Sequence, residues 1–176
     1  MNAANILNTL IKKKYIKVGK KKIEKISKLI GSDVILGGNN ASAVLKSNGA
    51  IKRFSKCPQF YTLLVRPNFG CSTKEIYSRV KKFTISKFTN PKKSMFNPAY
   101  LSQQSNALEK VAFSKYPKLK KIKSFLEKLK NPFFVRMTGT GSVIVAYYHS
   151  KKDCEMAKVQ FKRKYKKYWC NVSKTL

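Results

Sequence analysis

A chain of 176 residues that is 43% apolar can bury a hydrophobic core, which excludes an intrinsically disordered chain. No apolar run approaches the roughly 20 residues of a membrane helix, so we expect no membrane association. The formal net charge of +32 leaves two classes open: a nucleic-acid-binding module, and a folded enzyme whose polar surface is mostly lysine.

The amino-terminal part predicts two helices. Apolar residues between Ala3 and Ile11 recur at helical spacing, and a second amphipathic pattern ends at Gly31, a residue type favoured just after a helix. The acid-poor start also resembles an organelle transit peptide, but its periodicity continues as an ordinary domain helix.

Asp33 is one of only seven acidic residues. It follows the end of the second helix and leads into apolar residues 34–36, so we expect it to be partly buried in a strongly positive protein. Two interpretations stay open at this point: a carboxylate that stabilises a turn, or a charge retained for chemistry.

A hairpin and a domain boundary come next. Asn48-Gly49 stands between two apolar runs, residues 41–47 and 50–55, and Asn-Gly in that setting is the strongest short signal of a β-hairpin. Cys57-Pro58 then breaks the pattern, and we place the boundary between two domains there.

From Phe60 onward the patterns follow the order strand, helix, helices, strand, strand, helix, strand. That order predicts an α+β sandwich of the ferredoxin-like type. The expected strands are residues 61–65, 133–137, 143–148 and 168–172.

The helices of this second part have recognisable starts. Ser72-x-x-Glu75 and Asn106-x-x-Glu109 are capping signatures, and the first of these helices is expected to continue through Val80 and Phe83. Another helix is expected to start at Pro117, and a last one to run from Cys154 to Tyr165. Residues 84–100 hold two prolines and predict a surface connection.

Residues 136–142, Arg-Met-Thr-Gly-Thr-Gly-Ser, lie between two strongly apolar strands. Gly139 and Gly141 allow positive φ angles and a close approach of the backbone to a ligand. The stretch by itself fits both a glycine-rich hairpin and a ligand-binding loop.

The charge and the cysteines identify no site. Lysines occupy nearly every polar position and only five residues are arginine, the better reader of bases and phosphates, so we expect no specific nucleic-acid partner. A basic nucleic-acid-binding or ribosome-associated module stays the alternative function. Four scattered cysteines and one histidine predict no metal site, and reduced thiols are expected in a cytoplasmic protein.

Five patches occur in order along the chain. They are Asn2-Ala3-Ala4, Gly31-Ser32-Asp33-Val34, residues 65–77 (Val-Arg-Pro-Asn-Phe-Gly-Cys-Ser-Thr-Lys-Glu-Ile-Tyr), residues 105–113 (Ser-Asn-Ala-Leu-Glu-Lys-Val-Ala-Phe) and residues 136–142. Together they resemble the GHMP kinase superfamily (galactokinase, homoserine kinase, mevalonate kinase), and within it the branch acting on 4-diphosphocytidyl-2-C-methyl-D-erythritol. The resemblance implies a remnant of the ATP-binding amino-terminal domain over residues 1–57 and the carboxy-terminal domain over residues 58–176.

The resemblance also implies a chemistry, the transfer of the ATP γ-phosphate to the 2-hydroxyl of that substrate in the non-mevalonate isoprenoid pathway, with Mg²⁺. Asp33 matches the catalytic base, and Thr73 matches a threonine beside the substrate. Thr138, Gly139, Thr140 and Gly141 match a motif that forms one wall of the phosphate site. Asn2 would lie on the first turn of the helix that faces the phosphates. The implied partners are ATP and the small-molecule substrate, in a monomer or homodimer.

The sequence departs from the family pattern in three places. Ile35 stands where the family has proline, and Ala107 stands where it has aspartate. The family's Gly-Leu-Gly-Gly-Gly-Ser-Ser phosphate loop, which precedes the Asn-Ala-Ala helix, and a lysine expected near the reacting hydroxyl are not among these residues. We therefore expect the 176-residue polypeptide to be inactive by itself, and a regulatory partner without catalysis stays open as a third interpretation.

Overall fold

The structure is a computed structural model that describes residues 2–39, 41–46, 48–82 and 88–175. The chain divides into two compact units, and the first division falls between Cys57 and Pro58. A later segment that ends at Lys93 also belongs to the first unit. We describe each unit by itself.

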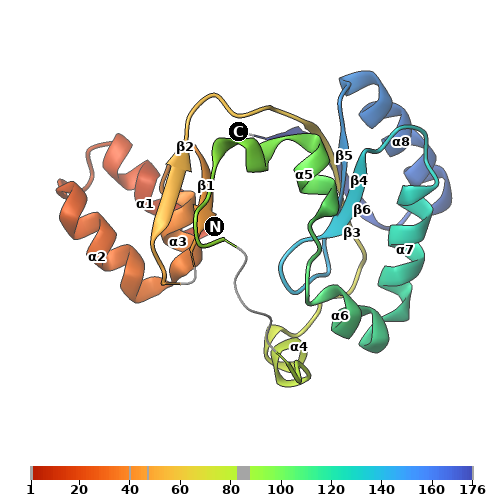
Figure 1. Ribbon diagram of the computed structural model, residues 1–176, viewed down its shortest axis with the longest axis horizontal. Coiled ribbons are helices and arrows are strands. Elements are labelled where there is room, and N and C mark those ends of the chain that lie inside the picture. Colours follow the sequence, from red (N-terminus) through yellow and green to blue (C-terminus); the bar gives the residue numbers. More distant parts are fainter. Residues whose placement is uncertain (1, 40, 47, 83–87, 176) are drawn as a thin grey trace. The chain divides into compact units, whose positions relative to one another are not determined.

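The first unit combines helices with a two-stranded hairpin (Figure 1). Its elements are α1 (Asn2–Lys12), α2 (Lys20–Ile30), α3 (Ser32–Gly37), β1 (Ser42–Leu45) and β2 (Ile51–Phe54). The two predicted helices are confirmed, and Gly31 ends α2 as expected. The apolar residues after Gly31 form the short helix α3, so Asp33 lies in a helical first turn.

The Asn48-Gly49 hairpin is confirmed. β1 and β2 pair antiparallel with Leu45 opposite Ile51, and Gly49 has a φ of 78° that suits glycine in a tight turn. The Asn48 side-chain oxygen accepts a hydrogen bond from the Ala50 amide at 3.1 Å. Ser47, which we expected at the end of the first strand, lies outside the described residues.

The hairpin is attached to the end of α3 by Arg53. Its guanidinium donates to the carbonyl oxygen of Ile35 at 2.6 Å and to that of Asn39 at 3.3 Å. Carbonyls at a helix carboxyl end lack partners within the helix and carry partial negative charge, so an arginine suits this position. Leu29 and Ile30, on the apolar stripe of α2, are 80% and 58% exposed because nothing in the described residues covers them.

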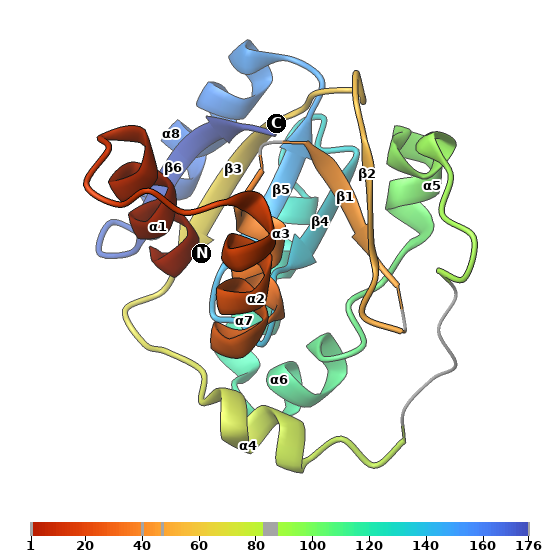
Figure 2. The same ribbon diagram turned by 90° about the vertical axis from the view of Figure 1, so that its left-hand side faces the viewer.

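The second unit contains the predicted ferredoxin-like sandwich. Its strands are β3 (Tyr61–Arg66), β4 (Phe134–Met137), β5 (Ile144–Tyr148) and β6 (Trp169–Lys174). They form an antiparallel sheet in the order β4-β5-β3-β6, which Figure 2 shows side by side. This is the strand order of a ferredoxin-like fold, so the prediction from Phe60 onward is confirmed.

Two long helices cover one face of this sheet (Figure 1). They are α7 (Pro117–Glu127) and α8 (Lys151–Lys164). Leu119, Ile122 and Leu126 of α7 and Ala157 and Phe161 of α8 are at most 2% exposed. Burial of each of the leucine, isoleucine and phenylalanine side chains among these contributes about 1.5–3 kcal/mol, so the two helices and the sheet share one core.

The shorter helices differ more from expectation. They are α4 (Thr73–Ser78), η1 (Lys93–Phe96), α5 (Pro98–Gln103) and α6 (Glu109–Lys115). α4 ends before Val80, because the Ser78 hydroxyl bonds to the Glu75 carbonyl oxygen and competes with the helical backbone. Phe83 lies outside the described residues. The expected connection over 84–100 contains η1 and the start of α5, which Asn97 caps through the Tyr100 amide.

Candidate active site

The loop between β4 and β5 carries the Thr-Gly-Thr-Gly sequence. The Thr138 amide donates to the Val143 carbonyl oxygen at 2.9 Å, and the Gly141 amide donates to that of Thr138 at 3.0 Å. Gly139 and Gly141 have φ angles of 55° and 89°, as their residue type permits. Among the described residues, the amides of Gly139 and Thr140 have no acceptor. The loop therefore presents free donors on a fixed backbone.

Asn106 holds this loop from outside the sheet. Its side-chain Nδ2 donates to the carbonyl oxygens of Met137 at 2.9 Å and Gly139 at 2.8 Å. Its Oδ1 accepts from the Leu108 amide at 2.9 Å, which orders the turn before α6. The expectation that Asn106 caps a helix was wrong, because Leu108 occupies the cap position and the asparagine amide is directed to the loop.

Glu109 completes the attachment of the loop. Its Oε1 accepts from the Met137 amide at 2.7 Å, and Lys123 of α7 lies 3.7 Å from its Oε2. In a capping box this carboxylate would turn back to its own helix. Here it bonds the free side of β4, so Asn106 and Glu109 together occupy both backbone groups of Met137.

Thr73 reaches the same loop from α4. Its Oγ1 lies 3.0 Å from the Oγ1 of Thr140, so the two hydroxyls share a hydrogen bond. Ser72 caps α4 by accepting from the Glu75 amide at 3.3 Å, which places Thr73 on the first turn of the helix. The structure thus brings together two of the positions that the family resemblance selected.

Glu75 ties α4 to the helices behind it. Its Oε1 lies 2.8 Å from Lys115 and 3.2 Å from Arg79, and its Oε2 accepts from the Tyr116 hydroxyl at 3.3 Å. The hydrogen bond from Lys115 is the main reason why the pKa of this carboxyl lies below its usual value. These bonds fix α4, and with it Thr73, relative to α6.

The backbone of Gly141 packs close to two side-chain sulfur atoms. A Cβ at this position would lie 3.0 Å from Met137 Sδ and 3.1 Å from Cys71 Sγ. Burial raises the pKa of the Cys71 thiol, so the thiol stays protonated and acts as a small apolar neighbour. The φ angle thus favours glycine here, and a Cβ would also require one of the two sulfur-containing side chains to shift by a few tenths of an ångström.

Arg136, at the start of the 136–142 stretch, directs its charge to backbone carbonyls and not to solvent. Its guanidinium donates to the carbonyl oxygens of Leu101 and Gln104 and lies 4.4 Å from the centre of the Phe134 ring. Burial lowers the pKa of this guanidinium from its usual value. Arg136 thus fixes the end of α5 against the sheet.

Asp33 and Asn2 lie in the other unit. Asp33 belongs to the first turn of α3 and Asn2 begins α1, and their side chains are outside what the structure describes. The structure therefore assembles Thr73 with Thr138–Gly141 and leaves the relation of Asp33 and Asn2 to that loop as a prediction. Sequence reasoning missed Asn106 and Glu109 as loop-holding residues, although both lie in a patch that carried the resemblance.

Other classes of site find no support in the described part of the chain. No group of three or more histidine, cysteine, aspartate or glutamate side chains is placed to hold a metal ion there. The four cysteines are free thiols, as expected. Among the described residues no helix is long and apolar enough to cross a membrane.

Comparison with known proteins assigns the fold. Residues 89–167 match the family described as GHMP kinases C terminal. The crystal structure of a 4-(cytidine 5'-diphospho)-2C-methyl-D-erythritol kinase superposes with a TM-score of 0.76 at 19% identity, covering 96% of this chain and 62% of that one. A homoserine kinase from Cytophaga hutchinsonii superposes with a TM-score of 0.57 at 13% identity, covering 78% and 49%. Residues 89–167 therefore match the carboxy-terminal domain of the GHMP kinase family, and the second unit of the chain has that fold.

Sequence similarity indicates which branch of the GHMP kinases the chain resembles. The 4-diphosphocytidyl-2-C-methyl-D-erythritol kinase of Pelagibacter ubique is 54% identical over all 176 residues, and this chain spans 63% of its length. The enzyme of that name from Petrotoga mobilis is 31% identical over 151 residues, 81% of this chain and 58% of the relative. These kinase names do not favour the nucleic-acid-binding alternative.

Proposed function

We propose that this chain forms part of an ATP-dependent kinase that phosphorylates the 2-hydroxyl of 4-diphosphocytidyl-2-C-methyl-D-erythritol. The observation that carries the proposal is the Thr138–Gly141 loop, which Asn106 holds and which shares a hydroxyl pair with Thr73. The 54% identity to the Pelagibacter kinase along the whole chain supports the choice of substrate.

The loop suits one wall of a phosphate site. Free backbone amides on a fixed, glycine-containing turn are good donors to phosphate oxygens, and the amides of Gly139 and Thr140 meet that description among the described residues. The exposed Thr73 would orient substrate through its hydroxyl, which is hydrogen-bonded to the hydroxyl of Thr140. In phosphoryl transfer such positioning and charge stabilisation account for most of the rate enhancement.

Asp33 would accept the proton of the substrate hydroxyl, and Asn2 would lie on the first turn of a helix directed at the phosphates. Both roles rest on the family motifs. The described residues offer no carboxylate cluster for a resident metal. Mg²⁺ would therefore arrive with ATP and be held largely by phosphate oxygens, a common arrangement for this ion.

The proposal includes the organisation of the protein. Residues 1–57 would belong to the amino-terminal, ATP-binding domain of the family and residues 58–176 to its carboxy-terminal domain. The partners would be ATP and the diphosphocytidyl substrate, with no specific nucleic acid and no membrane. The protein would act in the cytoplasm as a monomer or homodimer, in isoprenoid biosynthesis.

A chimera tests the function directly. The part of the Pelagibacter kinase that this chain does not cover is joined to Asn2–Leu176, and ADP release is followed with Mg-ATP and the diphosphocytidyl substrate. We expect substrate-dependent turnover. Asp33→Asn should lower kcat by about 10²-fold or more with a smaller effect on KM. No turnover from a folded chimera, while the Pelagibacter kinase is active in the same assay, would contradict the proposal and favour a chain without catalysis.

A further inference from the structure

The free edge of β4 offers backbone groups to a ligand. β4 ends the sheet order β4-β5-β3-β6, so in the part of the chain that the structure describes one side of this strand has no neighbouring strand. The Thr138 amide bonds to Val143 at the start of β5. Because backbone groups alternate in direction along an antiparallel strand, those of Phe134 and Arg136 also face β5, and those of Val135 and Met137 face the free edge.

Most backbone groups along this edge already have hydrogen-bond partners. The Met137 amide donates to Glu109, and its carbonyl oxygen accepts from Asn106. At the other end, the Phe133 amide donates to the Tyr147 carbonyl oxygen. Among the described residues, the N–H and C=O of Val135 have no partner, although the residue is only 8% exposed. One donor and one acceptor thus remain, side by side and pointing the same way.

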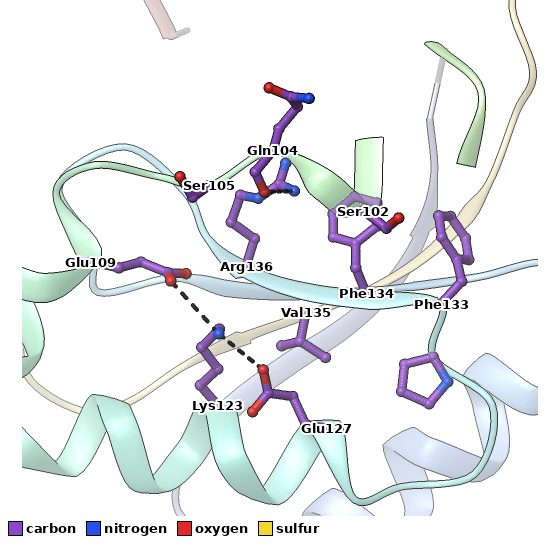
Figure 3. A pocket seen from close by; sticks show the side chains of 11 residues that line it. Ser102, Gln104, Ser105, Glu109, Lys123, Glu127, Phe133, Phe134, Val135 and Arg136 are labelled. Atoms are coloured by element: carbon purple, nitrogen blue, oxygen red, sulfur yellow. Dashed lines mark hydrogen bonds and ion pairs between the residues drawn. The ribbon is translucent and has the colours of Figure 1, made fainter. Parts of the chain in front are cut away.

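A cavity of about 340 Å³ opens at this point of the strand (Figure 3). It is lined by Ser102, Gln104, Ser105, Glu109, Lys123, Glu127, Pro132 and residues 133–136. Lys123 lies 2.9 Å from Glu127 and 3.7 Å from Glu109, and Arg136 donates to backbone carbonyls, so the charged groups already have partners. An added ion would disturb these pairs, and the cavity therefore suits a neutral ligand.

We propose that this cavity binds a small, neutral, planar heterocycle that carries an N–H donor next to a ring-nitrogen or carbonyl acceptor, as an aminopyrimidine or a lactam does. The ligand acceptor would take the Val135 N–H, and the ligand donor would bond to the Val135 C=O. A peptide strand is excluded, because strand addition needs pairs at successive alternate residues and Met137 is already bonded. The site does not depend on the proposed kinase activity.

A titration followed by amide NMR of the 176-residue chain tests the site. The probe is 2-aminopyrimidine, and the control is 2-(dimethylamino)pyrimidine, which has the same ring and no donor. We expect the Val135 amide resonance to shift saturably with a Kd of about 1 mM, a reasonable affinity for so small a ligand. The control should bind about 10-fold more weakly, because it leaves the Val135 carbonyl unpaired. An unchanged Val135 resonance, or equal shifts with both compounds, would overturn the proposal.

Two variants separate the site from nonspecific binding. Ser105→Phe fills the cavity from an exposed position, and Val135→Pro removes the donor, a change that an edge strand tolerates because its outward N–H is not part of the ladder. Ser173→Phe, on β6, is the matched control. We expect the first two variants to bind 2-aminopyrimidine at least 10-fold more weakly than the parent chain, and the control variant to bind it as the parent chain does. If Ser105→Phe binds as tightly as the control, the proposal fails even where Val135→Pro does not fold.

Discussion

The Oγ1 atoms of Thr73 and Thr140 lie 3.0 Å apart, although the two residues are separated by 67 positions in the sequence. Thr73 begins a helix that Ser72 caps and Glu75 anchors, and Thr140 lies in a loop that Asn106 holds. Two separately supported segments thus meet through one hydroxyl pair, and this pair is where the candidate site can be disturbed most selectively.

Thr73→Val removes that hydroxyl while keeping the shape of the side chain. Because the pair is exposed, we expect the free energy of unfolding to change by less than about 1 kcal/mol in urea. In the chimera, kcat/KM should fall about 10-fold or more if the hydroxyl orients substrate. Thr73→Ser keeps the hydroxyl and should retain most of the activity. Equal activity of the two variants would contradict a role for this group.

Asn106→Ala should destabilise the second unit more than an ordinary cap mutation. The variant loses two hydrogen bonds to loop carbonyls and one within the turn, so we expect a loss of about 2–3 kcal/mol in urea unfolding. Asn97→Ala, which removes one helix-capping bond at α5, should cost about 1 kcal/mol. A cost for Asn106→Ala no larger than that of the control would mean that the loop does not depend on it.

The glycines of the loop should differ in their response to alanine. Gly141→Ala introduces a Cβ close to Met137 and Cys71 at a φ of 89°, so we expect a loss of about 2–3 kcal/mol in unfolding free energy. Gly139→Ala meets no atom within 4 Å and has only the strain of a φ of 55°, which costs about 1 kcal/mol.

Gly70→Ala is the control for both glycine variants, because Gly70 has open space and no positive φ. Its free energy of unfolding should stay close to that of the parent chain. The order Gly141, Gly139, Gly70 is the prediction, and a reversed order would show that the loop packs differently.

Glu75 should contribute a pH dependence. Its folded pKa lies below the usual value of 4.5, so the charged form stabilises the fold above that pH, and the contribution is lost as the pH falls through the folded pKa. The urea midpoint of the parent chain should exceed that of Glu75→Gln near neutral pH, and the difference should shrink as the solution is acidified below 4.5. Glu155→Gln, whose partner Lys158 lies 4.0 Å away, should show a smaller change. A difference that does not vary with pH would contradict the account.

Local patterns in the sequence predicted most of the second unit. The strand at Tyr61, the helix start at Pro117 and the buried face of α8 follow from periodicity and turn chemistry, which depend on near neighbours only. The start of α5 at Asn97-Pro98 could also have been predicted, because asparagine favours the N-cap of a helix and proline favours its first position. Proline also favours loops, and the surface connection that we predict for residues 84–100 follows that preference instead.

The links that build the site could not be predicted locally. Asn106 and Glu109 fit a capping pattern, and only the tertiary structure shows that their side chains bond to Met137 and Gly139 instead. In the same way, the capping pattern predicted Thr73 on a helix start but not its contact with Thr140. The position of Asp33 and the scarcity of acidic residues left two interpretations of this residue open, and only the family motif selected it as the base; its side chain lies outside the described residues.

The most direct test of the central claim follows the loop itself during nucleotide binding. The chimera is labelled with ¹⁵N-glycine, and the resonance of Gly139 is identified by its loss in Gly139→Ala. If this loop forms one wall of the phosphate site, the Gly139 amide resonance should shift saturably on addition of Mg-ATP. The midpoint of that titration should match the Kd for ATP measured independently. A Gly139 resonance that stays in place while ATP demonstrably binds would contradict the assignment of this loop to the phosphate site.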